Sequence, residues 1–204
     1  MKFLAVPAFL ALAITGSELK PLTLDEALAE VTGEVAQPIE EVEEEVTVAP
    51  PEKVWVCEGC SENEKETLAF LQKRGIKDQA ALATVMGNIR QESMFLTDIC
   101  EGGSRVSYEN CHRGGFGLIQ WTSINRYRGL GAFAAKYGLS PTSLEAQLRW
   151  MVNEPQWIRY EPYLKGDGQS IEYYMKHAHA WLGWGIHGAR SHYAYNYYNR
   201  LTQA

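Results

Sequence analysis

The strongest constraint on the fold is a helical pattern of apolar side chains near the middle of the chain. These side chains recur with the i, i+3, i+4, i+7 spacing of a single helix face. They are Leu82, Val85, Met86 and Ile89. Asp78 precedes them and is a suitable N-cap residue. The pattern predicts a helix over residues 78–93 that packs one face against a core.

Other segments carry helix signals, whereas strand signals are weak. Ser61 and Glu64 form an S-x-x-E capping box, and Gly75 can end the helix that it opens. Further helices are expected to begin near Ser123, Ser140–Pro141 and Ser170, and a last one covers residues 188–201. Alternating patterns are limited to Val54–Val56 and a loop near residue 105. We therefore predict a mainly α domain of about six helices.

Charge and aromatic content divide the chain into two parts. Residues 17–53 hold 11 acidic and 2 basic side chains and no aromatic residue, whereas residues 67–204 hold 10 acidic and 15 basic ones. The acidic stretch repels itself and cannot bury enough apolar surface to offset its ordering entropy. We predict a disordered acidic linker over residues 17–56 and a folded domain over residues 57–204.

Charge and hydrophobicity also restrict the classes of binding partner. A cationic body suits a polyanionic partner such as a cell-envelope polymer, although an ordinary solvated surface explains the charge as well. The net charge of the whole chain is −6, which disfavours a nucleic-acid partner. No apolar run reaches the length of about 18 residues that a spanning helix needs, so stable membrane insertion is not expected.

The first residues resemble an export signal. Lys2 is followed by an apolar run over residues 3–14, and Ala11 and Ala13 form a small-x-small cleavage site. This predicts a secretory signal peptide over residues 1–16 and a secreted or periplasmic location. An uncleaved anchor and a loosely packed N-terminal segment are the alternatives.

Four cysteines, Cys57, Cys60, Cys100 and Cys111, are compatible with two disulfides in an exported chain. We favour pairing Cys57 with Cys60 and Cys100 with Cys111, although a bridge between the two segments is an alternative. Cys57-x-x-Cys60 is half of a zinc ribbon to which Cys111 and His112 could add ligands, but the second half lacks the paired spacing of a zinc site. A thioredoxin-type redox role would need a βαβ unit around the cysteines, and no such unit is predicted. A Cys–His peptidase would need one unpaired cysteine as the nucleophile at a helix N-terminus, and none of the four is placed in that way by its neighbours. We expect no metal and no cofactor.

Glu92 is the residue to which we assign chemistry. It lies seven residues after Val85 and three after Ile89, so it falls on the apolar face of the predicted helix. Burial disfavours the charged form of a carboxyl and raises its pKa, which is the condition for a general acid at neutral pH. The alternative is a helix end at which Glu92 emerges into water.

A polar, glycine-rich loop over residues 97–115 follows and leads into Gly-Phe-Gly-Leu-Ile-Gln-Trp-Thr. Gly117 allows the backbone to approach a ligand closely. Gln120 can bond sugar hydroxyls, and Trp121 offers an apolar face to a pyranose ring. Trp157 is predicted to line the same groove, while the other tryptophans are assigned to the core. These residues predict a glycan-binding cleft.

The two motifs together resemble the phage tail lysozyme family, which is related to goose-type lysozymes and soluble lytic transglycosylases. The resemblance rests on Gly87-Asn88-x-x-x-Glu92-Ser93 followed by Gly117-Leu118-Ile119-Gln120-Trp121, and it is clearest over residues 64–160. It implies a lysozyme-like α-rich fold and cleavage of the β-1,4 glycan of peptidoglycan. It also implies Glu92 as the general acid, with Ser93 orienting it by a hydrogen bond. A virion-associated location with tail proteins as partners is then an alternative to secretion.

The outcome of the reaction stays open. A hydrolase normally uses a second carboxylate, about 5 Å away for retention and about 6.5–9.5 Å away for inversion. Asp98 is the nearest candidate in sequence, ahead of Glu101 and Glu109. The related lytic transglycosylases need one Glu and often carry an Ala-Tyr-Asn motif, which residues 194–196 match without its glycine-rich continuation. A non-catalytic envelope-binding or virion structural module on the same fold is the rival hypothesis.

Overall fold

The computed structural model describes residues 54–112 and 114–204. The predicted signal peptide over residues 1–16 and most of the predicted linker lie outside this part. Residues 55 and 56 of the predicted linker lie in strand β1 (Trp55–Cys57), so they belong to the described fold.

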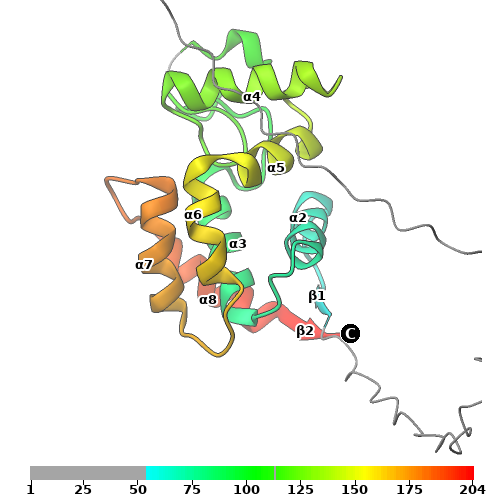
Figure 1. The fold of residues 1–204 in the computed structure, drawn as a ribbon, viewed down its shortest axis with the longest axis vertical. Helices are drawn as coiled ribbons and strands as arrows, with labels where there is room; N and C mark the ends of the chain where they lie inside the picture. The colour runs from blue at the N-terminus through cyan, green and yellow to red at the C-terminus, as the bar shows by residue number, and fades with distance from the viewer. Residues whose placement is uncertain (1–53, 113) are drawn as a thin grey trace, which may run out of the picture. The chain divides into compact units, whose positions relative to one another are not determined.

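The described residues form a mainly helical domain, as predicted (Figure 1). Its seven α-helices are α2 (Glu62–Lys73), α3 (Gln79–Ser93), α4 (Ile124–Lys136), α5 (Leu144–Asn153), α6 (Pro155–Leu164), α7 (Ile171–Leu182) and α8 (Arg190–Arg200). Strands β1 (Trp55–Cys57) and β2 (Leu201–Gln203) pair antiparallel, with Val56 opposite Thr202. Within the described residues, no helix is both long and apolar enough to span a bilayer.

Side-chain caps explain where most helices begin. Five N-cap side chains accept a hydrogen bond from a backbone N–H of the first turn: Ser61, Asp78, Ser123, Ser143 and Ser170. The capping box of Ser61 and Glu64 is confirmed. The helix predicted to begin at Ser140–Pro141 instead begins at Leu144, because Ser143 provides the cap. Helix α6 was not predicted, although Pro155 at its first position is a helix-start signal; Glu154 before it makes no capping hydrogen bond.

Helix α3 is the buried helix around which the domain is organised. It contacts α2, α7 and α8, and the contact with α8 is the most extensive. Gly87 allows this close approach, because a Cβ atom at that position would lie 2.5 Å from the backbone nitrogen of Ala194 on α8. The sequence pattern that predicted one buried face therefore identified the central helix.

Replacing Gly87 with alanine should destabilise the domain by about 1–2 kcal/mol. Alanine in a helix interior normally gains about 0.5–1 kcal/mol over glycine, but overpacking against the α8 backbone costs about 1–3 kcal/mol. Urea denaturation measures the change. The matched control is Gly185→Ala, because a Cβ atom there meets nothing within 4 Å. Equal stability of the two variants would contradict the packing argument.

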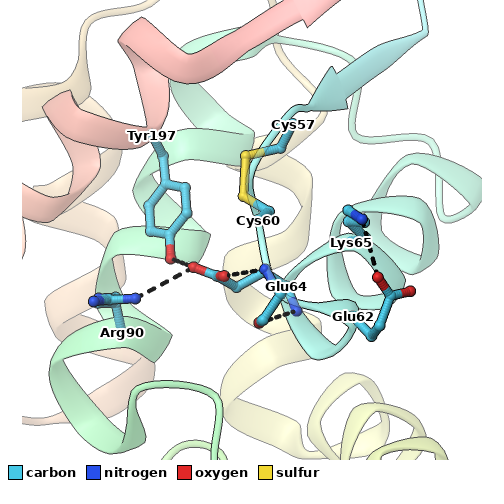
Figure 2. The surroundings of a disulfide bond; sticks show 8 residues. Cys57, Cys60, Glu62, Glu64, Lys65, Arg90 and Tyr197 are labelled. Carbon is cyan, nitrogen blue, oxygen red and sulfur yellow. Dashed lines mark hydrogen bonds and ion pairs between the residues drawn. A yellow bond between two sulfur atoms is a disulfide. The ribbon is translucent and has the colours of Figure 1, made fainter.

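Both predicted disulfides are confirmed. Cys57 pairs with Cys60 where β1 leads into α2, and Cys100 pairs with Cys111 across the glycine-rich loop (Figure 2 shows the first pair). All four cysteines are among the described residues, and none is a free thiol. This pairing leaves no thiolate for the zinc or peptidase alternatives. The second disulfide and an isolated bridge between Cys100 and Phe116 hold the loop that precedes the candidate site.

Candidate active site

The Glu92 side chain lies at the C-terminal end of α3 and is 16 % exposed. Met94, in a left-handed conformation, ends the helix two residues later. The carboxylate forms an ion pair with Arg190, the first residue of α8. Glu92 therefore does not emerge freely into water, and its partner comes from a helix that is distant in sequence.

The surroundings of Glu92 shift the pKa of its carboxyl upwards. Burial is the largest influence, and it raises the pKa of the Glu92 carboxyl above its ordinary value. The positive charges of Arg190 and Arg126 and the hydrogen bond from Arg190 act in the opposite direction, but burial outweighs them. A carboxyl group in these surroundings is suited to donating a proton and to remaining stable as a carboxylate afterwards.

Arg190 joins Glu92 to the connection between α7 and α8. Its side chain is only 5 % exposed. Its Nη1 atom donates to the carbonyl oxygens of Ile186, at 3.3 Å, and His187, at 2.9 Å. Its guanidinium carbon lies 4.5 Å from the ring centroid of Trp184. These contacts hold the guanidinium in one position beside the Glu92 carboxylate.

The Ser93 hydroxyl bonds to backbone groups rather than to the Glu92 carboxylate. It donates to the carbonyl oxygen of Leu118 at 2.7 Å and accepts from the backbone N–H of Phe95 at 3.1 Å. The prediction of a hydrogen bond from Ser93 to Glu92 is therefore wrong, because the hydroxyl donates its hydrogen bond to the Leu118 carbonyl oxygen instead. Ser93 instead ties the end of α3 to the turn over residues 117–121.

The same turn is held from the other side by the buried Gln147 of α5. Its Oε1 atom accepts from the backbone N–H of Leu118 at 2.7 Å, and its Nε2 atom donates to the carbonyl oxygen of Thr97 at 2.6 Å. Gly117 has a φ of 71°, and a Cβ atom there would lie 2.7 Å from the Gln147 amide. A glycine at position 117 is thus required for the turn to pack against Gln147. This packing accounts for the glycine without the close approach of a ligand that the sequence suggested.

The Gln120 side chain is half-buried and bonded to the backbone, and neither predicted tryptophan platform is accessible. The Gln120 Nε2 atom donates to the carbonyl oxygens of Gly117, at 3.0 Å, and Ile99, at 3.3 Å, so its Oε1 atom is the part left for a ligand. Trp121 and Trp157 are both completely buried. The Trp157 ring packs edge-on against Trp181 in the core. Neither buried ring can stack on a sugar in this conformation, so these two predictions are corrected.

Trp121 belongs to a buried ionic network near Glu92. Its Nε1 atom donates to Glu154 at 3.0 Å, and the Glu154 side chain is 1 % exposed. Arg126 of α4 donates to both oxygens of Glu154, at 2.7 and 2.8 Å. Because the charge of Arg126 also lowers the pKa of Glu92, this network contributes to the electrostatics of the site.

The other sequence candidates lie in more exposed settings. Asp98 forms an ion pair with Arg105 of the same loop, and its side chain is 32 % exposed. Its role as a second carboxylate stays a prediction. Tyr195 of the Ala-Tyr-Asn match is exposed and donates to Glu172. Among the described residues, no group of three or more metal-binding side chains is positioned to hold a metal ion.

Four residues around Glu92 and the 117–121 turn were not identified as functional from the sequence: Arg126, Gln147, Glu154 and Arg190. For Gln147 a signal existed, because a polar residue interrupts the apolar stripe of Leu144, Leu148 and Met151. Five surface hollows of about 250–680 Å³ are lined by residues other than Glu92. The assignment of Glu92 therefore rests on its burial and its partners.

Comparison with known proteins gives one family. A family model described as phage tail lysozyme matches residues 62–201. The matched range contains all seven described helices, Glu92 and the turn over residues 117–121. No curated protein and no solved structure gives a significant match to the chain.

Proposed function

Because the chain belongs to the phage tail lysozyme family, we propose that it cleaves the glycan strands of peptidoglycan with Glu92 as the general acid. Family membership implies lysozyme-like cleavage of peptidoglycan. The observation that carries the assignment of the acid is the largely buried Glu92 carboxyl, whose pKa is raised by burial. Peptidoglycan is then the substrate.

In this mechanism the protonated Glu92 donates its proton to the glycosidic oxygen while the glycosidic C–O bond breaks. The resulting carboxylate is stabilised by the hydrogen bond and charge of Arg190. Glu92 then acts as a base. It removes a proton from water while the water oxygen bonds to the anomeric carbon, which gives hydrolysis. Alternatively it removes a proton from a hydroxyl of the same sugar while that oxygen bonds to the anomeric carbon, which gives an anhydro product. Asp98 is the candidate second carboxylate for the hydrolytic route.

Location and partners follow from the same proposal. The family suggests a virion or extracellular setting, and two disulfides are compatible with an oxidising one. The chain then acts outside the cytoplasm, on its own for wall lysis or with virion tail proteins for local wall penetration.

Arg190→Gln should move the alkaline limit of activity to higher pH. Arg190 lowers the pKa of Glu92, so its removal raises that pKa further. A general acid is active while protonated, and its activity falls as the pH rises through its pKa. The measurement is the pH dependence of kcat/KM on solubilised glycan strands. Arg190→Lys keeps the charge and is the control, so its alkaline limit should stay closer to that of the parent. A limit that is unchanged or lower in Arg190→Gln would contradict the assignment.

The proposed function is tested by incubating the purified chain with purified peptidoglycan and separating soluble from sedimented material. We expect soluble fragments to be released over time. If the chain sediments with the wall and releases no soluble fragments, the glycosidase proposal fails. The rival hypothesis of a non-catalytic envelope-binding module is then favoured.

A further inference from the structure

A second candidate binding site lies in a hollow of about 370 Å³ between α3 and α8. Its lining is polar or aromatic throughout: Arg90, Tyr193, Asn196, Tyr197, Asn199 and Arg200. We propose that this hollow binds an oxyanion, a phosphate or carboxylate group carried by a cell-wall polymer. The proposal concerns binding, and it rests on the proposed function only in choosing the wall as the source of the anion.

The first cation of the hollow is Arg90, and Glu64 does not use all of its N–H donors. Its Nη1 atom lies 3.4 Å from Glu64, which is a long contact. The Glu64 carboxylate is already occupied, because it accepts from the Tyr197 hydroxyl and from the backbone N–H of Ser61 (Figure 2). A guanidinium has five N–H donors, so most of those on Arg90 are not used by Glu64. Its side chain is 38 % exposed and accessible to a ligand.

The second cation, Arg200, forms no ion pair with a carboxylate in the part of the chain that the structure describes. Its guanidinium carbon lies 5.4 Å from the ring centroid of Tyr197, and that of Arg90 lies 5.8 Å from the ring of Tyr193. Both tyrosines belong to α8. Stacking on aromatic rings limits the freedom of the two guanidinium groups, so less entropy is lost when they bind an anion.

The charge balance of the hollow favours an anion. Two arginines face one carboxylate, Glu64, whose pKa is lowered in these surroundings, so that it stays charged. One positive charge therefore remains without a compensating acidic group. Guanidinium groups bind phosphate and carboxylate through paired hydrogen bonds. The amide groups of Asn196 and Asn199 in the lining add donors and acceptors suited to the hydroxyls of a polymer.

The position of the hollow links it to the candidate active site. Tyr193 and Arg200 follow Arg190 on the same helix, at about 4.5 and 15 Å along its axis, from a rise of about 1.5 Å per residue. A wall polymer held at Glu92 thus has an anion site within reach along α8. Such a site would retain the protein on the anionic wall between cleavage events.

The test measures anion binding by the full chain carrying Glu92→Gln, so that glycan cleavage plays no part. Sodium phosphate and sodium acetate are added at constant ionic strength, and backbone and arginine side-chain signals are followed by NMR. We expect saturable shifts confined to α8 and Arg90. Tighter binding of phosphate identifies a wall-polymer phosphate as the source, and tighter binding of acetate identifies a peptide carboxylate.

Arg200→Gln should weaken anion binding about tenfold, the effect of losing one charged hydrogen-bonding group. Arg200→Lys should give an intermediate loss, because it keeps the charge but not the paired donors. The control is Arg159→Gln on α6, which removes the same charge away from the hollow. The proposal is overturned if neither anion gives saturable shifts at α8, or if Arg159→Gln weakens binding as much as Arg200→Gln. Because no cleavage is measured, either result is independent of the proposed glycosidase activity.

Discussion

Glu92→Gln should lower the rate of peptidoglycan cleavage by about 10²–10⁴-fold, the usual contribution of a general acid. Glutamine has nearly the same shape and can still accept a hydrogen bond from Arg190, but it has no proton to transfer to the leaving oxygen. The measurement is the initial rate of soluble fragment release at a fixed amount of wall. Sedimentation with the wall should be unchanged, because binding does not need the proton.

Asp98→Asn is the matched control for this variant, because it makes the same chemical change on the neighbouring loop. A mechanism with one carboxylate predicts little change in rate for Asp98→Asn. A comparable loss would identify a hydrolase with two carboxylates, with Asp98 as the second. Retention of more than a tenth of the parent rate in Glu92→Gln would contradict its role as the acid.

Glu154→Ala should destabilise the domain by about 3–5 kcal/mol, which is typical for the removal of one partner from a buried ion pair. The change leaves the Arg126 guanidinium without its paired acceptor and the Trp121 indole N–H without its bond. Thermal or urea unfolding measures the effect.

The matched control for this prediction is Glu145→Ala on α5. The partner of Glu145 is Arg149, one turn along the same helix, and this ion pair is largely exposed. Its removal should cost no more than about 1 kcal/mol. A similar, small loss in both variants would show that the Glu154 network contributes little to stability.

The sequence was sufficient for features that depend on local geometry. Helix periodicity placed Glu92 on a buried face of α3, and capping residues such as Ser61 and Asp78 marked where helices begin. Spacing along the chain also favoured the correct disulfide partners, since Cys57 with Cys60 and Cys100 with Cys111 close short loops. In each case the interacting groups lie within a few turns or one loop.

The features that the sequence did not predict depend on contacts between distant segments. Arg190 and Glu92 lie 98 residues apart in the sequence, and Arg126 meets Glu154 because α4 packs against α5, which Glu154 ends. The burial of Trp121 and Trp157 is likewise decided by neighbouring helices. A tryptophan next to a glycine-rich turn has the same local pattern whether it faces a groove or the core.

The central claim is that the chain breaks glycosidic bonds through Glu92, and mass spectrometry of the digestion products tests it most directly. Purified peptidoglycan is treated with the parent chain and with Glu92→Gln, and the soluble products are identified. We predict fragments with new glycan ends from the parent only, carrying either a reducing sugar or an anhydro sugar lighter by one water. Products with intact glycan and new peptide ends, or the same products from both proteins, would contradict the claim.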